Sequence, residues 1–185
     1  MGFDRYVEKG GKRLRYGYTT GSCATAAAKG AAMMLLTQKD IEQIGIDTPK
    51  GWPLELALMD RSFSADKAEC AVIKDAGDDP DITDGVRVFA GVVPVPEPGI
   101  VFLGGEGVGT VTLPGLALPV GEPAINPVPR EMITRELDKV AEACHYSGGF
   151  AVTIAIPQGV ALARRTFNPK LGIEGGLSVV GTSGI

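Results

Sequence analysis

The chain has 185 residues, which is enough to bury a core, and its 44% hydrophobic and 22% charged residues are typical of a globular protein. The formal net charge of −4 and the absence of a strongly basic stretch argue against a nucleic-acid partner. The single histidine, His145, excludes sites built from several histidines. The three cysteines, Cys23, Cys70 and Cys144, are widely separated, which indicates a reducing compartment. No segment resembles a secretory signal or approaches ~20 apolar residues, so we expect a cytoplasmic protein without a membrane partner.

The first thirteen residues differ from the rest of the chain in charge. They contain Arg5, Lys9, Lys12 and Arg13 around the Gly10–Gly11 pair. Glycines and unpaired charge near a chain end are typical of mobile, solvated segments. We therefore expect a mobile basic arm over residues 1–13, followed by one domain over residues 14–185.

The next segments predict a helix and a hairpin. Small apolar residues recur at helical spacing from Cys23 to about Gln38, which predicts a helix whose alanine face lets another backbone approach closely. Residues 39–51 indicate a short connection or a partial helix. Leu54–Leu58 and Ala68–Ile73 both alternate in polarity, and we expect them to pair as a hairpin with a long loop.

The second half of the chain predicts one long helix and several short strands. Pro129 suits the first turn of a helix that carries an apolar stripe and ends near Gly148. A short helical stretch is expected after Pro157. The expected strands are Val86–Val93, Ile100–Leu103, Thr110–Leu113, Phe150–Ile156 and Leu177–Val180.

Together these elements predict an α+β fold in which a mixed or antiparallel sheet with hairpins packs against a few helices. A final strand followed by "GTSGI" normally leads into further structure. We therefore expect the natural protein to be longer than this chain.

Four residues before the first helix suggest either a cap or a binding site. Thr19, Thr20, Gly21 and Ser22 all offer hydroxyl or backbone donors. Helix capping alone explains one such residue and contributes ~1 kcal/mol. The alternative is that the positive end of the helix receives a carboxylate or a similar anion.

Five aspartates lie within ten residues of the stretch "KDAGDDPDITDG", at positions 75, 78, 79, 81 and 84. The spacing is not that of a calcium-binding EF-hand loop. Turn formation explains part of the pattern. The remainder suggests recognition of hydroxyls, ammonium groups or a cationic cosubstrate, because crowded carboxylates are costly without positive partners.

Other polar stretches leave similar alternatives open. The glycines of "GGEGVGTVT" precede a strand rather than a helix, so a close backbone or ligand approach is favoured over a dinucleotide loop. Asn126 and Arg130 enter the second long helix, where Arg130 is either an anion ligand or a solvent-exposed side chain. Thr182 and Ser183 add further donors. Neither a nucleophile elbow nor a hydrolase triad is indicated, because glycines do not flank Ser22, Ser178 or Ser183 in the G-x-S-x-G pattern of the elbow and only one histidine is available.

The motifs taken in order resemble a known family. The stretches "GYTTGSCATAAAKGA", "VIKDAGDDPDITDG", "GEGVGTVTLPGL", "GEPAINPVPREMI" and "TFNPKLGIEGGLSVVGTSGI" look like the cobalamin-biosynthesis family CbiD, the cobalt-precorrin-5B C1-methyltransferases. The resemblance covers about residues 14–185.

The resemblance implies methyl transfer from S-adenosylmethionine to C-1 of cobalt-precorrin-5B in the anaerobic route to vitamin B12. It also implies that no protein-bound metal is needed, since the cobalt belongs to the substrate, and that a C-terminal α/β domain carrying part of the cosubstrate site follows in the family. It leaves a homo-oligomer open. The alternative to an enzyme is a non-catalytic module that binds tetrapyrrole or lines a domain interface.

The resemblance and the donor pattern together predict two groups of site residues. For the carboxylate-rich substrate we expect Thr19, Thr20, Gly21, Ser22, Asn126, Arg130, Thr182 and Ser183. For the cosubstrate's sulfonium, amino group or ribose hydroxyls we expect Asp75, Asp78, Asp79 and Asp81. Catalysis then depends on alignment, since the substrate carbon itself attacks the methyl group.

Overall fold

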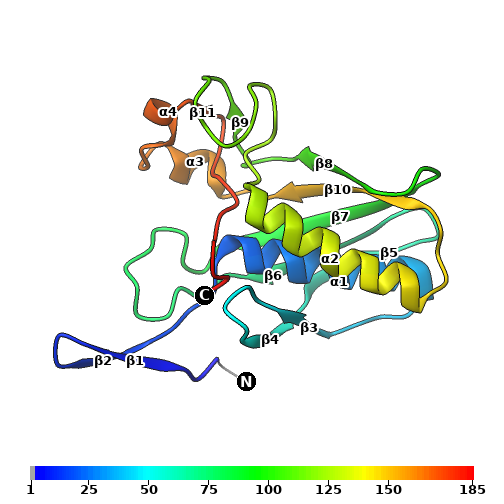
Figure 1. Cartoon of the computed structure of the whole chain (residues 1–185), viewed down its shortest axis with the longest axis horizontal. Coiled ribbons are helices and arrows are strands. Elements are labelled where there is room, and N and C mark those ends of the chain that lie inside the picture. The colour runs from blue at the N-terminus through cyan, green and yellow to red at the C-terminus, as the bar shows by residue number, and fades with distance from the viewer. Residues whose placement is uncertain (1–2) are drawn as a thin grey trace.

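A computed structural model describes residues 3–185 of the chain and centres on a five-stranded mixed sheet (Figure 1). The strand order is β5-β6-β7-β10-β8; β10 runs parallel to β8, and the other neighbours are antiparallel. The strands are β5 (Met59–Phe63), β6 (Ala68–Ile73), β7 (Arg87–Val95), β8 (Ile100–Gly104) and β10 (Gly149–Ala155). The predicted α+β class with a mixed sheet is confirmed.

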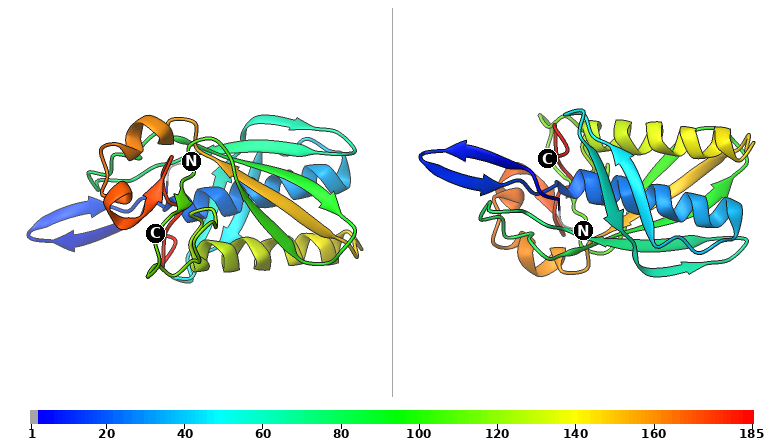
Figure 2. Two further views of the ribbon diagram at one scale, coloured as in Figure 1. Left: turned by 90° about the horizontal axis from the view of Figure 1, so that it is seen from above. Right: turned by 90° about the horizontal axis from the view of Figure 1, so that it is seen from below.

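Two long helices cover the same face of this sheet (Figure 2). They are α1 (Thr20–Thr37) and α2 (Pro127–Ala143), and the predictions of both helices are confirmed. The alanines along α1, among them Ala24, Ala27 and Ala31, are completely buried, because small side chains allow the helix to lie close to its neighbours. None of the helices within residues 3–185 combines the length and apolar character needed to span a bilayer.

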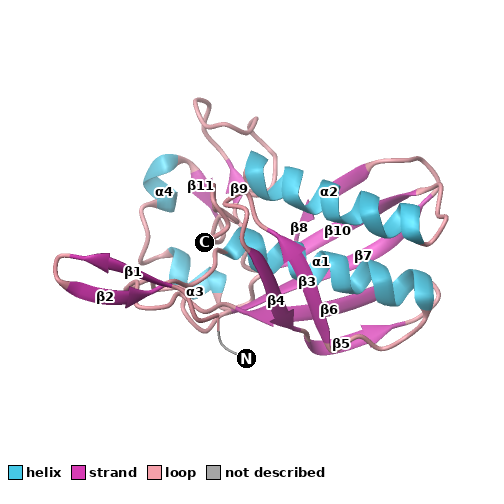
Figure 3. Ribbon diagram, turned by 60° about the horizontal axis from the view of Figure 1, so that its bottom comes forward, coloured by secondary structure: helices cyan, strands magenta, loops and turns pink. Residues whose placement is uncertain are grey.

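The predicted hairpin between Leu54–Leu58 and Ala68–Ile73 is wrong. Strand β3 (Gln43–Asp47) pairs instead with β4 (Pro53–Ala57) in a separate two-stranded sheet, visible in front of α1 in Figure 3. Strand β6 pairs with β5 and β7. The alternation of apolar residues identified the buried side of each strand, but it carried no information about the partner strand.

Residues 6–15 form a hairpin that projects from the body of the molecule (Figure 1). Its strands are β1 (Tyr6–Lys9) and β2 (Lys12–Arg15), joined by Gly10 and Gly11, both with positive φ. Paired positive-φ residues are typical of a tight hairpin turn that matches the strand twist. The expected arm therefore has regular structure, which extends past residue 13; its mobility stays a prediction, and residues 1–2 lie outside the described part.

The remaining elements are short. They are β9 (Thr110–Val111), α3 (Gly159–Ala163), α4 (Asn168–Leu171) and β11 (Ile173–Glu174). The segment expected as the strand Leu177–Val180 makes only single bridges, to Val108 and Ile125, since its partners are loops. At Gly107, a side chain would overlap the carbonyl of Ile156, so the glycine loop serves a close backbone approach.

Candidate functional site

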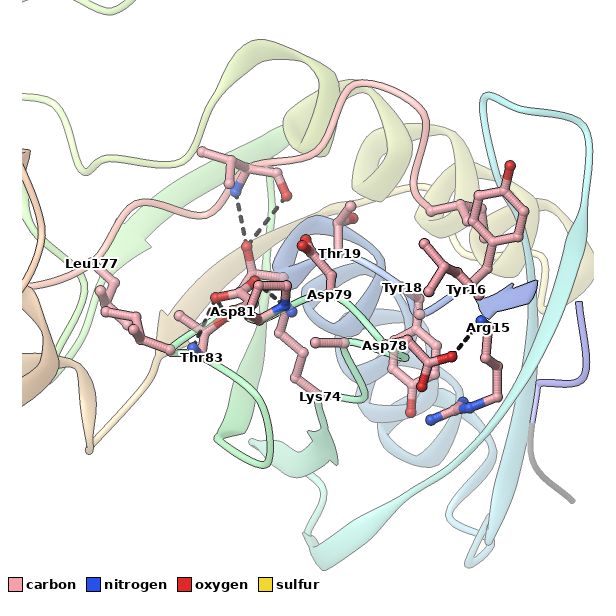
Figure 4. A pocket seen from close by; sticks show the side chains of 18 of the residues that line it. Arg15, Tyr16, Tyr18, Thr19, Lys74, Asp78, Asp79, Asp81, Thr83 and Leu177 are labelled. Atoms are coloured by element: carbon pink, nitrogen blue, oxygen red, sulfur yellow. Dashed lines mark hydrogen bonds and ion pairs between the residues drawn. The ribbon is translucent and has the colours of Figure 1, made fainter. Parts of the chain in front are cut away.

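A cleft of about 620 Å³ opens between the hairpin and the aspartate-rich loop (Figure 4). This volume lies within the usual range for small-molecule sites. Its walls come from the hairpin, the start of α1, the loop that follows β6, and the segment near residue 180. Lining residues include Val7, Lys9, Leu14, Arg15, Tyr18, Thr19, Thr20, Lys74, Asp78, Asp79, Asp81, Thr83, Asn168, Leu177, Val180 and Ile185.

Two glycines allow the hairpin's base and the aspartate loop to meet. A Cβ at Gly17 would overlap the backbone of Ala76, and a Cβ at Gly77 would overlap the carbonyl of Arg15. The contact is held by backbone hydrogen bonds: the Tyr18 N–H donates to Asp75 at 2.9 Å, and the Asp78 N–H donates to Arg15 at 3.0 Å. The cleft geometry therefore depends on positions without side chains.

Arg15 neutralises the first carboxylate of the loop. Its guanidinium donates to both oxygens of Asp75 at 2.7 and 2.8 Å, which is the bidentate geometry typical of strong arginine–carboxylate pairs. These hydrogen bonds hold the pKa of Asp75 below its ordinary value and raise the pKa of Arg15. The Arg15 N–H also donates to the Asp78 carboxylate at 2.7 Å.

Lys74 neutralises a second carboxylate. It is nearly buried and lies 2.8 Å from Asp81, whose other oxygen accepts from the backbone and hydroxyl of Thr83. Burial alone would raise the pKa of Asp81, but the hydrogen bonds from Lys74 and Thr83 outweigh it and lower the pKa. Asp84 accepts from the Ala76 N–H at 2.9 Å. Much of the acidic crowding in this loop is thus balanced inside the chain.

Charges of both signs remain unpaired at the cleft. Among residues 3–185, neither Asp78 nor Asp79 forms an ion pair, and both are exposed at the loop wall. On the hairpin wall, Lys9 has no acidic partner within the same described range. The cleft therefore has an acidic side and a basic side, and it can attract a cation and an anion at different walls.

The donors at the start of α1 are largely used by the chain itself. The Thr19 hydroxyl caps the helix by accepting from the Ser22 N–H, and the Ser22 hydroxyl donates to Gly184. The Thr20 hydroxyl accepts from the N–H of Val180 and donates to its carbonyl, which also accepts from the Gly21 N–H at 2.9 Å.

The consequence is that this helix start anchors residues 180–184. Of the four predicted residues, Thr19 and Thr20 line the cleft, whereas Gly21 and Ser22 lie behind it. Of the two alternatives for this helix start, capping and anion binding, capping describes the hydrogen bonds that these residues form.

The other predicted substrate residues do not line the cleft. Arg130 donates to Glu122 and to the carbonyls of Ile125 and Pro123, which ties the preceding loop to α2. Asn126 is the N-cap residue of α2, and its N–H donates to Val179. Thr182 and Ser183 follow the lining segment but do not line the cleft, and the Ser183 hydroxyl donates to Ile185.

The predicted cosubstrate residues are brought together more closely. The cleft is lined by Asp78, Asp79 and Asp81. Asp75 does not line it and forms an ion pair with the lining residue Arg15. The residues that sequence reasoning missed are Arg15, Lys74 and Lys9. A signal was present for two of them, because Lys74 directly precedes the aspartates and Lys9 belongs to the basic hairpin.

The buried thiols are unsuited to nucleophilic attack. Cys23 lies in the first turn of α1, where a thiolate would be stabilised, but burial raises its pKa to about 12. Burial likewise raises the pKa of Cys70 to about 12. Across residues 3–185, no group of three or more histidine, cysteine, aspartate or glutamate side chains is arranged to hold a metal ion.

The structure is an α+β fold whose cleft has one acidic wall and one basic wall. The chain belongs to the CbiD family, whose model matches residues 7–185, and the resemblance seen in the motifs is confirmed. It is 53% identical over 182 residues to a protein from Alkaliphilus metalliredigens named cobalt-precorrin-5B C(1)-methyltransferase. That match covers 98% of this chain and 48% of the relative.

Two further relatives agree. A protein of the same name from Burkholderia cenocepacia is 55% identical over 172 residues, covering 93% of this chain and 48% of the relative. The 1.9 Å crystal structure of the cobalamin biosynthesis protein cbiD from Archaeoglobus fulgidus matches with a TM-score of 0.70 and 30% identity, covering 97% of this chain and 56% of that one. The chain spans about half the length of the curated relatives it matches.

Proposed function

We propose that this chain forms one domain of a longer cobalt-precorrin-5B C1-methyltransferase, and that its cleft brings a carboxylate-rich tetrapyrrole together with S-adenosylmethionine. The observation that carries the proposal is the convergence of separate family motifs on one cleft. The stretches containing Thr19, Asp78 and Leu177 all line it, although about 160 residues separate the first from the last.

The residues present fit a cationic cosubstrate. Asp78 and Asp79 are exposed carboxylates on one wall, and within the described residues neither has a cation partner. S-adenosylmethionine would supply a sulfonium-bound methyl group as the electrophile. The two carboxylates would attract its positive charges, since Coulomb attraction in a partly shielded cleft is stronger than in bulk water.

The part played by the protein is to position and orient the reactants. Asp81 and Asp75 fix the acidic loop through Lys74 and Arg15, and the Asp78 carboxylate accepts from the Arg15 N–H, so the loop that carries Asp78 and Asp79 is held in place before a ligand binds. Orientation of two reactants can contribute up to about 7–11 kcal/mol, which is sufficient when the substrate carbon is itself the nucleophile. Thr19 and Thr20, at the start of α1, also line the cleft.

Binding measurements on the full-length protein test the proposal. Asp78→Asn and Asp79→Asn together remove two charges but keep the oxygen that accepts from the Arg15 N–H. We expect the dissociation constant for S-adenosylmethionine to rise at least tenfold, about 1.4 kcal/mol, because the attraction of both carboxylates is lost. The matched control is Asp66→Asn with Asp138→Asn, which removes the same charge from exposed sites outside the cleft.

Two outcomes contradict the proposal in different ways. An unchanged dissociation constant rejects the acidic wall as the cosubstrate site. Binding of corrinoid without any binding of S-adenosylmethionine favours the alternative, a tetrapyrrole-binding module without catalysis.

A further inference from the structure

The tip of the β1–β2 hairpin carries two cations in an unfavourable arrangement. Lys9 and Lys12 are directly opposite each other in the antiparallel register, next to the Gly10–Gly11 turn. Like charges directly opposite are destabilising. No acidic side chain in residues 3–185 forms an ion pair with either lysine, although the chain has 22 acidic residues and a net charge of −4.

These lysines lie on the same face of the hairpin as an apolar pair. Residues directly opposite share a face, and side chains two positions apart along a strand share it as well. Val7 pairs with Leu14, so Val7, Leu14, Lys9 and Lys12 form one face. Three of them, Val7, Leu14 and Lys9, line the cleft. The cleft side of the hairpin is thus apolar near the body and cationic toward the tip.

The opposite face of the hairpin has different partners. There Tyr6 is opposite Arg15, and Glu8 is opposite Arg13. The Arg13 guanidinium lies 4.0 Å from the centre of the Tyr6 ring, a cation–π distance. Both arginines of that face therefore have partners within the chain, Arg13 at Tyr6 and Arg15 at Asp75, unlike the two lysines.

We propose that the cleft-side face of the hairpin binds a flat polycarboxylate. Val7 and Leu14 contact the apolar ring surface, and Lys9 and Lys12 pair with carboxylates at the ring's edge. This inference rests on the proposed function and names the wall that takes the tetrapyrrole. The acidic loop on the facing wall disfavours a polyanion there, so the two ligands are separated by charge.

The test uses uroporphyrin, a stable flat tetrapyrrole with carboxylates on every ring, as a probe for the full-length protein. We expect Lys9→Ala with Lys12→Ala to raise the dissociation constant for uroporphyrin about tenfold, measured from the shift in its absorption band. Its affinity should also become less sensitive to salt, because two ammonium–carboxylate pairs are lost. Lys9→Arg with Lys12→Arg should restore binding.

Matched controls separate this site from a general charge effect. Arg13→Ala with Lys39→Ala removes the same net charge from the opposite hairpin face and from a surface outside the cleft. The single tryptophan, Trp52, lies beside Arg5 at the hairpin's base, so its fluorescence shows whether the hairpin remains in place. Affinity for S-adenosylmethionine should stay unchanged in all variants.

Three results would overturn the inference. If the wild-type protein does not bind uroporphyrin, the substrate side of the proposed function fails with it. If the wild type binds and the double alanine variant binds equally well, only the hairpin site is rejected. An equal loss in the Arg13 and Lys39 control shows that net charge, and not this face, governs binding.

Discussion

The hydroxyl of Thr20 holds the segment near residue 180 against α1, and Thr20→Val tests that link. Valine has nearly the same shape but cannot form either hydrogen bond to Val180, at 3.0 Å to its N–H and 3.2 Å to its carbonyl. In this variant the Val180 carbonyl still accepts from the Gly21 N–H, whereas the Val180 N–H loses its hydrogen-bond partner. An unpaired donor costs about 1–3 kcal/mol when buried. Because this one is partly buried, we expect a loss of about 1–2 kcal/mol.

Two measurements distinguish a local loss from general destabilisation. Urea unfolding gives the free energy of unfolding, and hydrogen exchange should accelerate at Val180 by about 5- to 30-fold, corresponding to the same 1–2 kcal/mol. Thr25→Val is the matched control, since the buried Thr25 hydroxyl donates to Gly21, whose carbonyl retains its helical hydrogen bond. If both variants lose the same stability and Val180 exchanges at the wild-type rate, Thr20 does not anchor this segment.

Two further predictions concern the cleft walls. Gly17→Ala should lower the free energy of unfolding by more than about 2 kcal/mol, because its Cβ would overlap the Ala76 backbone. Gly45→Ala is the control: its Cβ has space, so the free energy of unfolding should change by no more than about 0.5 kcal/mol. Equal effects of the two substitutions in urea unfolding would contradict the close approach at Gly17. The pKa of Asp75 is lowered by Arg15 on folding, so its contribution to stability is complete above pH ~4 and is lost as pH falls through the folded pKa. The stability difference between wild type and Asp75→Asn should therefore shrink below pH ~4, and a difference constant from pH 7 to pH 3 would contradict this.

Sequence reasoning predicted the elements whose signal is local. Helices α1 and α2 and strands β7, β8 and β10 have clear apolar periodicity and turn residues at their ends. It failed for β5, because the strand sequence "MDRSF" is mostly polar and does not alternate cleanly. Once β5 was missed, β4 and β6 were consecutive strands, and their pairing was the natural but incorrect expectation.

The candidate site was predicted in part for a similar reason. Donor-rich and acidic stretches were visible in the sequence, and the structure brings Thr19, Thr20, Asp78, Asp79 and Asp81 to one cleft. The sequence could not reveal that the donors at the start of α1 are used by residues 160 and 162 positions away. The sequence likewise could not reveal the acceptors of Arg130, since two of them are carbonyls positioned only by the folded loop.

The two walls of the cleft are fixed to different degrees. The acidic wall is held by the pairs Arg15–Asp75 and Lys74–Asp81 and by backbone hydrogen bonds across Gly17 and Gly77. The hairpin is tied down at its base, where Arg15 belongs to both walls, while its lysine tip projects from the body (Figure 1). Under the proposed function, a compact cation would therefore meet a preorganised wall, and a large anion would meet a projecting strand pair. Arg15 connects the two walls, because it belongs to the hairpin while its backbone N–H donates to Asp78 and its guanidinium pairs with Asp75.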